Sequence, residues 1–375
     1  MTDTAAVPRV DASDLSYDEF CKQYMGPNRP VLITNIGADW PIYQTWRQGD
    51  NGDVNVAFLR AHFGDAVVPV VGYGKTEGYG GEDRGTMTLD AYLALLESGK
   101  AEAKQQYMKD WHFTRDFPET AAYTTPIFFQ DDWLNWWWDQ PTTPTRDDYR
   151  FVYLGPAGST TPLHHDVLLS YSWSINICGR KEWLLFPPTE TWKLWDRSGR
   201  CTATNATEFD ATQFPHLATA HHVRVVQGVG EALFVPSGWY HQVQNLDRDT
   251  LSVNHNWFNA YSLEQMWAFL QHELAAVERE IGHCRDSFDS DDEWLDHCQV
   301  VLRANIGMSY VDVAALLRAR KAWYLSADDA IRRLDMTYSV QQINKVLEAM
   351  SAHPSQQRGH PSDDHAIPRC NAHST

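Results

Sequence analysis

Between residues 150 and 257 the chain repeats short apolar or alternating runs that are typical of β-strands. Clusters of Gly and Pro separate these runs, as at residues 155–158 and 236–238. Short strands at this spacing predict an antiparallel sandwich or barrel, with residues 189–221 as a long insertion. The predicted strands are residues 150–154, 171–178, 181–186, 222–227, 231–235, 240–245 and 250–257.

The two ends of the chain carry other patterns. Residues 1–15 are polar and are expected to be disordered, and residues 16–149 mix short helical and strand-like runs. After residue 260 apolar residues recur at helical spacing, which predicts a helical region over residues 261–351. A polar tail with several histidines, residues 352–375, is expected to be disordered. The pattern therefore predicts a mainly β domain at 16–260 with a helical appendage.

Three stretches before residue 150 bear on function. Residues 72–86 hold six glycines and predict a mobile loop, either a surface excursion or a functional loop. Residues 105–113 alternate as a strand, with Tyr107, Lys109 and Trp111 on one side. Residues 114–149 have no regular pattern, and four of their tryptophans crowd into six positions, where they either pack under a loop or form a substrate wall.

Composition limits the classes of partner. The formal net charge is −18, which disfavours direct nucleic-acid binding and favours a basic protein partner, or simply solubility. The six cysteines include no CxxC pair, which argues against a cysteine zinc site and for a reducing compartment. The start of the chain has no signal-like apolar region, and no run of about 18 apolar residues occurs, so we expect no membrane span and a cytoplasmic or nuclear location.

The candidate chemistry centres on residues 161–188. His164 and Asp166 are two residues apart, so on extended backbone both can reach one metal ion, while His165 between them points away. A third ligand, His241, follows the turn at 236–239. Two histidines and one carboxylate form the facial triad of non-haem iron(II) oxygenases. Each motif alone is weak, because the chain has 16 histidines and His241 could be an ordinary buried histidine.

Lys181 lies in an otherwise apolar strand, 15 residues after Asp166. A lysine that faces a core needs an anionic partner, and the distal carboxylate of a 2-oxo acid would be one. If the Lys181 side chain faces solvent instead, it needs no anionic partner and gives no indication of a 2-oxo acid.

The segments TPLHHD…CGRKEWLLFPP, GEALFVPSGWYHQVQN and RPVLITN…W resemble the jumonji-C family of 2-oxoglutarate oxygenases, over roughly residues 16–260. The resemblance implies a double-stranded β-helix (cupin or jelly-roll) core, with Fe(II), 2-oxoglutarate and O₂ as cofactors. It implies that His164, Asp166 and His241 are the iron ligands. It assigns 2-oxoglutarate binding to Lys181, Thr161 and Tyr107, and it suggests Asn254, Ser174 and Asn176 as further pocket residues, with Trp173 and Trp183 as wall material.

Within the family, the chain resembles lysyl hydroxylases of the eukaryotic translation termination factor. This implies a protein substrate with a basic target loop, the release factor. Two alternatives stay open: an N-methyl-lysine demethylase of histones or other proteins, and a non-catalytic cupin-like binding module. The helical region would pack on the barrel or form a homodimer.

Overall fold

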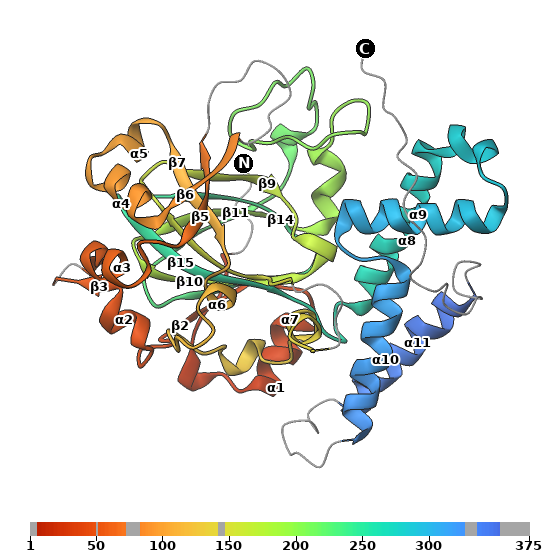
Figure 1. The fold of residues 1–375 in the computed structure, drawn as a ribbon, viewed down its shortest axis with the longest axis horizontal. Coiled ribbons are helices and arrows are strands. Elements are labelled where there is room, and N and C mark those ends of the chain that lie inside the picture. Colours follow the sequence, from red (N-terminus) through yellow and green to blue (C-terminus); the bar gives the residue numbers. More distant parts are fainter. Residues whose placement is uncertain (1–5, 50–51, 73–82, 142–146, 327–335, 353–375) are drawn as a thin grey trace. The chain divides into compact units, whose positions relative to one another are not determined.

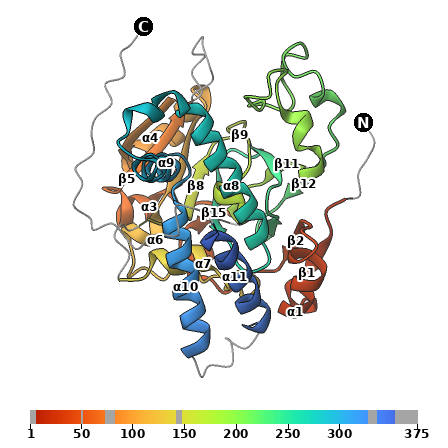
Figure 2. The same cartoon turned by 90° about the vertical axis from the view of Figure 1, so that its right-hand side faces the viewer.

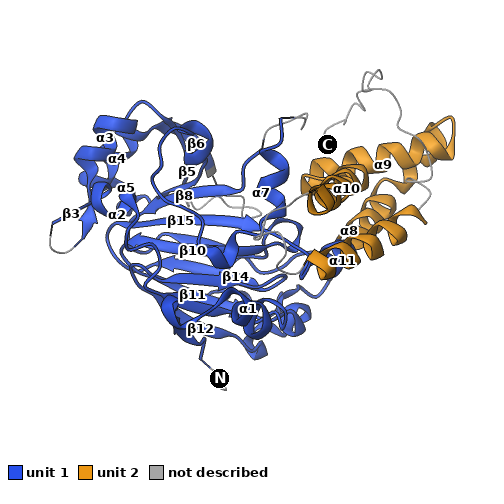
Figure 3. Ribbon diagram, turned by 90° about the horizontal axis from the view of Figure 1, so that it is seen from below, with its two compact units in different colours: residues 1–269 blue, residues 270–375 orange. Residues whose placement is uncertain are grey.

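The computed structural model describes residues 6–49, 52–72, 83–141, 147–326 and 336–352. It divides into two compact units, Met1–Phe269 and Leu270–Thr375, which Figure 3 colours separately. All the candidate site residues belong to the first unit.

Two sheets form the core of the first unit (Figure 1). The larger sheet has nine strands in the order β1 (Arg9–Asp11), β2 (Val31–Thr34), β13 (Ala232–Val235), β10 (Tyr171–Cys178), β15 (Thr250–Trp257), β8 (Arg150–Gly155), β7 (Gln106–Trp111), β5 (Val67–Gly72) and β6 (Asp83–Thr88). The smaller has the order β12 (Val223–Gln227), β11 (Lys181–Phe186), β14 (Tyr240–Asn245) and β9 (Thr160–His164). A short pair, β3 (Arg47–Gln48) and β4 (Asp53–Val54), stands apart. The predicted strands between 150 and 257 are all present, and the sheets form the expected cupin-type core.

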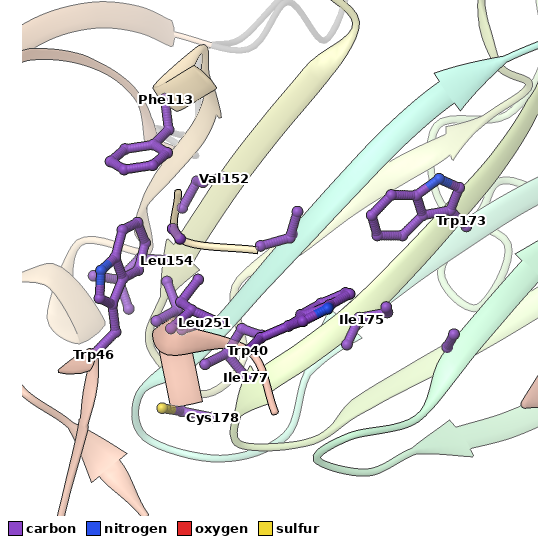
Figure 4. Close-up of a cluster of buried hydrophobic side chains, with 14 of the residues drawn as sticks. Trp40, Trp46, Phe113, Val152, Leu154, Trp173, Ile175, Ile177, Cys178 and Leu251 are labelled. Carbon is purple, nitrogen blue, oxygen red and sulfur yellow. The ribbon is translucent and has the colours of Figure 1, made fainter. Parts of the chain in front are cut away.

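The period of two along β10 separates an apolar outer face from a polar inner face. Trp173 and Ile175 join the large apolar cluster, where Figure 4 shows them with Trp40 and other ring and aliphatic side chains. Trp173 stacks on Phe129, with ring centroids 5.5 Å apart. The expectation that Trp173 walls the pocket is therefore wrong, because its position along the strand places it on the face opposite to Ser174.

Residues 9–14 form regular structure, although disorder was expected for residues 1–15. Strand β1 pairs in parallel with β2, and Arg9 donates hydrogen bonds to Glu231 and to the Val226 carbonyl. Figure 2 shows β1, β2 and α1 (Tyr17–Phe20) side by side. A free sheet edge offers backbone partners to a polar segment whose composition predicts disorder. Residues 1–5 lie outside the described residues.

Short helices flank the larger sheet: α2 (Pro41–Thr45), α3 (Val56–Phe63), α4 (Leu89–Glu97), α5 (Lys100–Ala103), α6 (Phe113–Asp116) and α7 (Trp133–Trp138). The stretch 114–149 is thus partly helical, and in α7 Trp133 and Trp138 are buried while Trp136 and Trp137 are half-buried. The predicted loop 72–86 is shorter, because Asp83–Thr88 pairs with β5 as a strand. Residues 73–82 lie outside the described residues.

The insertion between β11 and β12 covers the outer face of the smaller sheet. It contains two 3₁₀-helices, η5 (Pro188–Leu194) and η6 (Leu217–Thr219). Leu194, Phe214 and Leu217 of the insertion pack with Leu163 and Leu184 of the sheet. The insertion therefore supplies the apolar cover that one side of a β-sandwich requires.

Helix α8 (Leu263–Glu280) leads into the second unit, which contains α9 (Asp291–Ile306), α10 (Tyr310–Ser326) and α11 (Met336–Ser351). The helices match the predicted helical region, and α10 packs against α11. In the described part of the chain no single helix has the length and apolar composition of a membrane span, although α9 and α10, bent by 75°, pass that test as a pair. The expected disordered tail, from residue 353 on, lies outside the described residues.

Candidate metal centre and cofactor pocket

Adjacent strands of the smaller sheet carry the two candidate histidine ligands. His164, the last residue of β9, pairs with His241 near the start of β14, and their ring centroids are 4.3 Å apart. Asp166 follows β9 on extended backbone (φ −72°, ψ 154°), which turns its carboxylate towards the same point. One donor atom from each of the three side chains lies within 4.8 Å of the others. The structure thus brings together the three ligands that the sequence predicts.

Hydrogen bonds to backbone carbonyls orient both imidazoles. His164 Nδ1 lies 2.8 Å from the Pro162 carbonyl oxygen, and His241 Nδ1 lies 3.0 Å from that of Trp239. With Nδ1–H donating, each Nε2 keeps its lone pair, and each Nε2 is 3.9 Å from an Asp166 oxygen. Two imidazole nitrogens and one carboxylate on one side of an open cavity fit an iron(II) ion with free coordination positions.

The electrostatics of His164 and Asp166 favour the forms that bind a metal. Although 39% of the His164 side chain is exposed, the surrounding protein and then His241 lower its pKa to about 3. Burial raises the pKa of the Asp166 carboxyl, but the two histidines and hydrogen bonds from Ser172 and Asn256 bring it below its ordinary value. His164 is therefore neutral and Asp166 ionised at neutral pH, as metal ligands must be.

A β-bulge in β9 brings Thr161 to the same side as His164. His164 pairs with His241, and Thr161 pairs with Val243, so three residues of β9 lie opposite two of β14. Without the bulge, residues three apart would face opposite sides of the sheet. Thr161 consequently lines the cavity beside the metal ligands.

Lys181 is buried inside the barrel, so the solvent-facing alternative is wrong. Its Nζ donates to Ser252 Oγ at 2.5 Å and lies 5.4 Å from the Tyr153 ring centroid and 5.9 Å from that of Trp183. Burial, and then the nearby charge of Lys109, lower its pKa to about 7. None of the ion pairs found among the described residues gives Lys181 a carboxylate partner. A buried lysine of this kind fits the distal carboxylate of a bound dicarboxylate.

The remaining predicted pocket residues lie on the inner faces of β10 and β15. Asn254 Nδ2 donates to Ser252 Oγ at 2.8 Å, which links it to Lys181. Ser174 pairs with Asn254 across the strands, and its buried hydroxyl has no hydrogen-bond partner in the described part of the chain. Asn176 donates to the Gln227 carbonyl at 3.0 Å and so holds β10 to the end of β12.

Tyr107 lies on the inner face of β7, with its ring centroid 6.0 Å from that of Tyr153. It packs over Gly155, where a Cβ atom would come 2.4 Å from the tyrosine ring. Trp111, predicted on the same side as Tyr107, faces the outer apolar cluster. The reason is a register shift at Asp110, whose φ of +62° reverses the alternation.

A cavity of about 590 Å³ opens beside the metal ligands. Sequence reasoning missed several of its lining residues: Lys109, Asp148, Tyr149, Phe151, Tyr153 and Asn256. The alternation of aromatic residues along β8 is a signal that could have identified one wall. His165 also lines the cavity, packs on Tyr240 and, as predicted, is not one of the three converging ligands. The ring centroids of Trp183 and His241 are 5.7 Å apart, but Trp183 is not among the residues that line the cavity, so its role as a wall residue stays a prediction.

Comparison with known proteins agrees with this geometry. Residues 17–262 match the family model of the cupin-like domain. The human 2-oxoglutarate and iron-dependent oxygenase JMJD4 is 38% identical over 92% of this chain and 84% of its own length. The zebrafish (Danio rerio) protein of the same name is 40% identical over 81% and 72%. The arginine-specific demethylase JMJ20 of Arabidopsis thaliana is 38% identical over 81% of this chain and 68% of its own length.

Proposed function

The chain belongs to the cupin-like, jumonji-C family of iron- and 2-oxoglutarate-dependent oxygenases, and from this premise we propose that it hydroxylates a lysyl side chain of the translation termination factor. The main support for a hydroxylase that acts on a protein substrate is the cavity beside His164 and Asp166. This cavity opens to the protein surface, where a side chain of another protein could enter. Its volume of about 590 Å³ is within the usual range for ligand pockets and accommodates a small cofactor together with one side chain. The net charge of −18 favours a basic target.

Iron(II) and 2-oxoglutarate together supply an oxidant that inserts one atom of O₂ into a C–H bond and leaves the other in succinate, with release of CO₂. The protein's part is to bind and orient. His164, Asp166 and His241 would hold the metal, and Lys181 with the Thr161 hydroxyl would bind the distal carboxylate of 2-oxoglutarate. Tyr107 and Tyr153 close the inner end of the pocket.

The proposal is tested by incubating the protein with iron(II), 2-oxoglutarate and the termination factor, followed by peptide mass mapping. We expect one added oxygen atom on a single lysine, and none with the His241→Ala variant. If 2-oxoglutarate is turned over but the termination factor gains no oxygen, the substrate assignment is wrong while the oxygenase assignment stands.

A second candidate is removal of an N-methyl group from a basic side chain. It is favoured by the Arabidopsis relative, whose name records an arginine-specific demethylase and whose identity equals that of the human relative. Hydroxylation of an N-methyl group releases formaldehyde, so formaldehyde from methyl-lysyl or methyl-arginyl peptides would select this function. The third hypothesis, a non-catalytic binding module, is not retained, because the family is enzymatic and the ligand set is complete.

Two further expectations stay predictions: a cytoplasmic location, and a homodimer formed through the C-terminal helices. Size-exclusion chromatography with light scattering tests the dimer, and deletion of α9–α11 should then give a monomer.

A further inference from the structure

The register between β8 and β15 shows which residues lie at the inner end of the cavity and which lie near its mouth. Tyr153 pairs with Ser252, which binds Lys181, and the Asn256 amide donates to the Tyr149 carbonyl. Asn256 in turn hydrogen-bonds the Asp166 ligand. Ser252 and Asn256 are four residues apart, which is about 13 Å along a strand. Tyr149 therefore lies near the metal ligands rather than near Lys181. Asp148, the preceding residue, lies still further along the cavity from Lys181, where the distal carboxylate of the cofactor is expected.

Asp148 has an acceptor atom without a donor. Its side chain is only 4% exposed, and it lines the cavity. Arg150 Nη1 reaches one carboxylate oxygen, Oδ1, at 3.4 Å, while Arg150 Nη2 is engaged by Asp139. The other oxygen, Oδ2, lies 3.7 Å from His112 Nδ1, too far for a hydrogen bond. Among the described residues, neither Oδ2 nor His112 Nδ1 has a hydrogen-bond partner.

A buried carboxylate oxygen without a hydrogen-bond donor lowers the stability of the folded protein. A cationic ligand that donates to this oxygen would remove the penalty. The neighbouring acidic side chain Asp110 is already engaged, since it accepts from Tyr153 at 2.8 Å and pairs with Arg84 at 3.5 Å. Asp148 is paired with Arg150 through Oδ1, and its Oδ2 is the buried carboxylate oxygen on this wall that has no hydrogen-bond donor among the described residues.

Aromatic rings line the same cavity as Asp148. The His112 ring lies 5.1 Å from Phe151, and Tyr149 lies 6.4 Å from Phe151, in edge-on contacts. Ring faces accept both the methylene stem and the charge of a lysyl or arginyl side chain. A buried acid in a cavity that is also lined by aromatic rings has the chemistry of a cation subsite.

We infer that Asp148 is the specificity residue that binds the cationic head of the substrate side chain and so holds its methylene groups over the metal. The inference deepens the proposed function and rests on it, because it assumes that the substrate is a protein with a basic target side chain. It assigns cation recognition to one carboxylate and leaves metal and 2-oxoglutarate binding to other residues.

The test compares a termination-factor peptide that contains one lysine with the same peptide carrying norleucine, which keeps the chain of methylene groups and removes the charge. Binding is measured on the full-length protein loaded with manganese(II) and 2-oxoglutarate, which does not turn over. For Asp148→Asn we expect about 10- to 100-fold weaker binding of the lysyl peptide and unchanged binding of the norleucine peptide. Glu119→Gln, at an exposed acid that is not among the residues lining the cavity, is the matched control and should bind both peptides like the wild type.

Activity on the lysyl peptide gives a second readout: KM should rise, while 2-oxoglutarate affinity and metal binding stay unchanged. Equal effects of Asp148→Asn on both peptides, or no effect, would overturn the inference and assign Asp148 a structural role with Arg150. If Asp148→Asn does not fold, Asp148→Glu should keep the preference for lysine over norleucine, and loss of that preference would count against the inference. If the wild type prefers the lysyl peptide but adds no oxygen to it, the proposed function fails while the subsite stands.

Discussion

Substitution of Lys181 by Met should make the protein more stable and unable to bind 2-oxoglutarate. Burial, with help from Lys109, lowers the Lys181 pKa from 10.5 to about 7. That difference corresponds to a cost on the order of 5 kcal/mol for keeping the charged lysine in the folded protein at neutral pH or below. The substitution loses the hydrogen bond to Ser252, which contributes about 1.5–3 kcal/mol. The expected net gain is therefore about 2–3 kcal/mol.

The sign of the pH dependence follows from the same pKa. Because the folded pKa lies below the unfolded value, the penalty is fully present below pH 7 and is relieved as pH rises from about 7 towards the unfolded value. The stability difference between Lys181→Met and the wild type should therefore be largest at acidic pH and shrink under alkaline conditions.

The assay is thermal unfolding with and without manganese(II) and 2-oxoglutarate. A gain of 2–3 kcal/mol raises Tm by roughly 5 °C in a domain of this size. The wild type should gain further stability when 2-oxoglutarate is added, and the variant should not. Lys104→Met, at an exposed lysine, is the control and should change neither quantity. A lower Tm for Lys181→Met, together with a retained response to 2-oxoglutarate, would refute the view that this lysine is kept for the cofactor.

Three further predictions concern the same pocket. Thr161→Val keeps the shape of the side chain and removes the hydroxyl, so KM for 2-oxoglutarate should rise about 10-fold or more in steady-state assays, whereas Thr160→Val, on the opposite face, should behave like the wild type. Gly155→Ala places a Cβ 2.4 Å from the Tyr107 ring and should lower stability by about 1–3 kcal/mol in denaturant unfolding, while Gly85→Ala, with nothing within 4 Å, should not. Binding of 2-oxoglutarate requires Lys181 to be charged, so above a pH of about 7 its Kd, measured by calorimetry, should rise by up to tenfold per pH unit, and a flat profile would contradict the pKa.

The positions of most core strands could be predicted from the sequence because alternation with a period of two is a local property. The same property failed where a strand is interrupted. At Asp110, a positive φ moves Trp111 to the outer face, and in β9 a bulge moves Thr161 to the inner face. A register shift depends on the partner strand, so no pattern within either segment could show it.

The chain by itself determined the chemistry of the centre: two histidines and an aspartate at positions where strands begin or end, with one lysine in an apolar strand. These residues stand out in the sequence because histidine, aspartate and lysine are uncommon within or beside apolar strands unless they bind a metal or pair with an opposite charge. Tertiary structure alone decided which further residues join them. Lys109, Asp148 and Tyr153 come from strands and loops that are distant in sequence, and only the pairing of β7, β8 and β15 places them around one cavity. The burial of Asp148 and the lack of a hydrogen-bond donor at its Oδ2 among the described residues arise from that packing and cannot be read from the order of the residues.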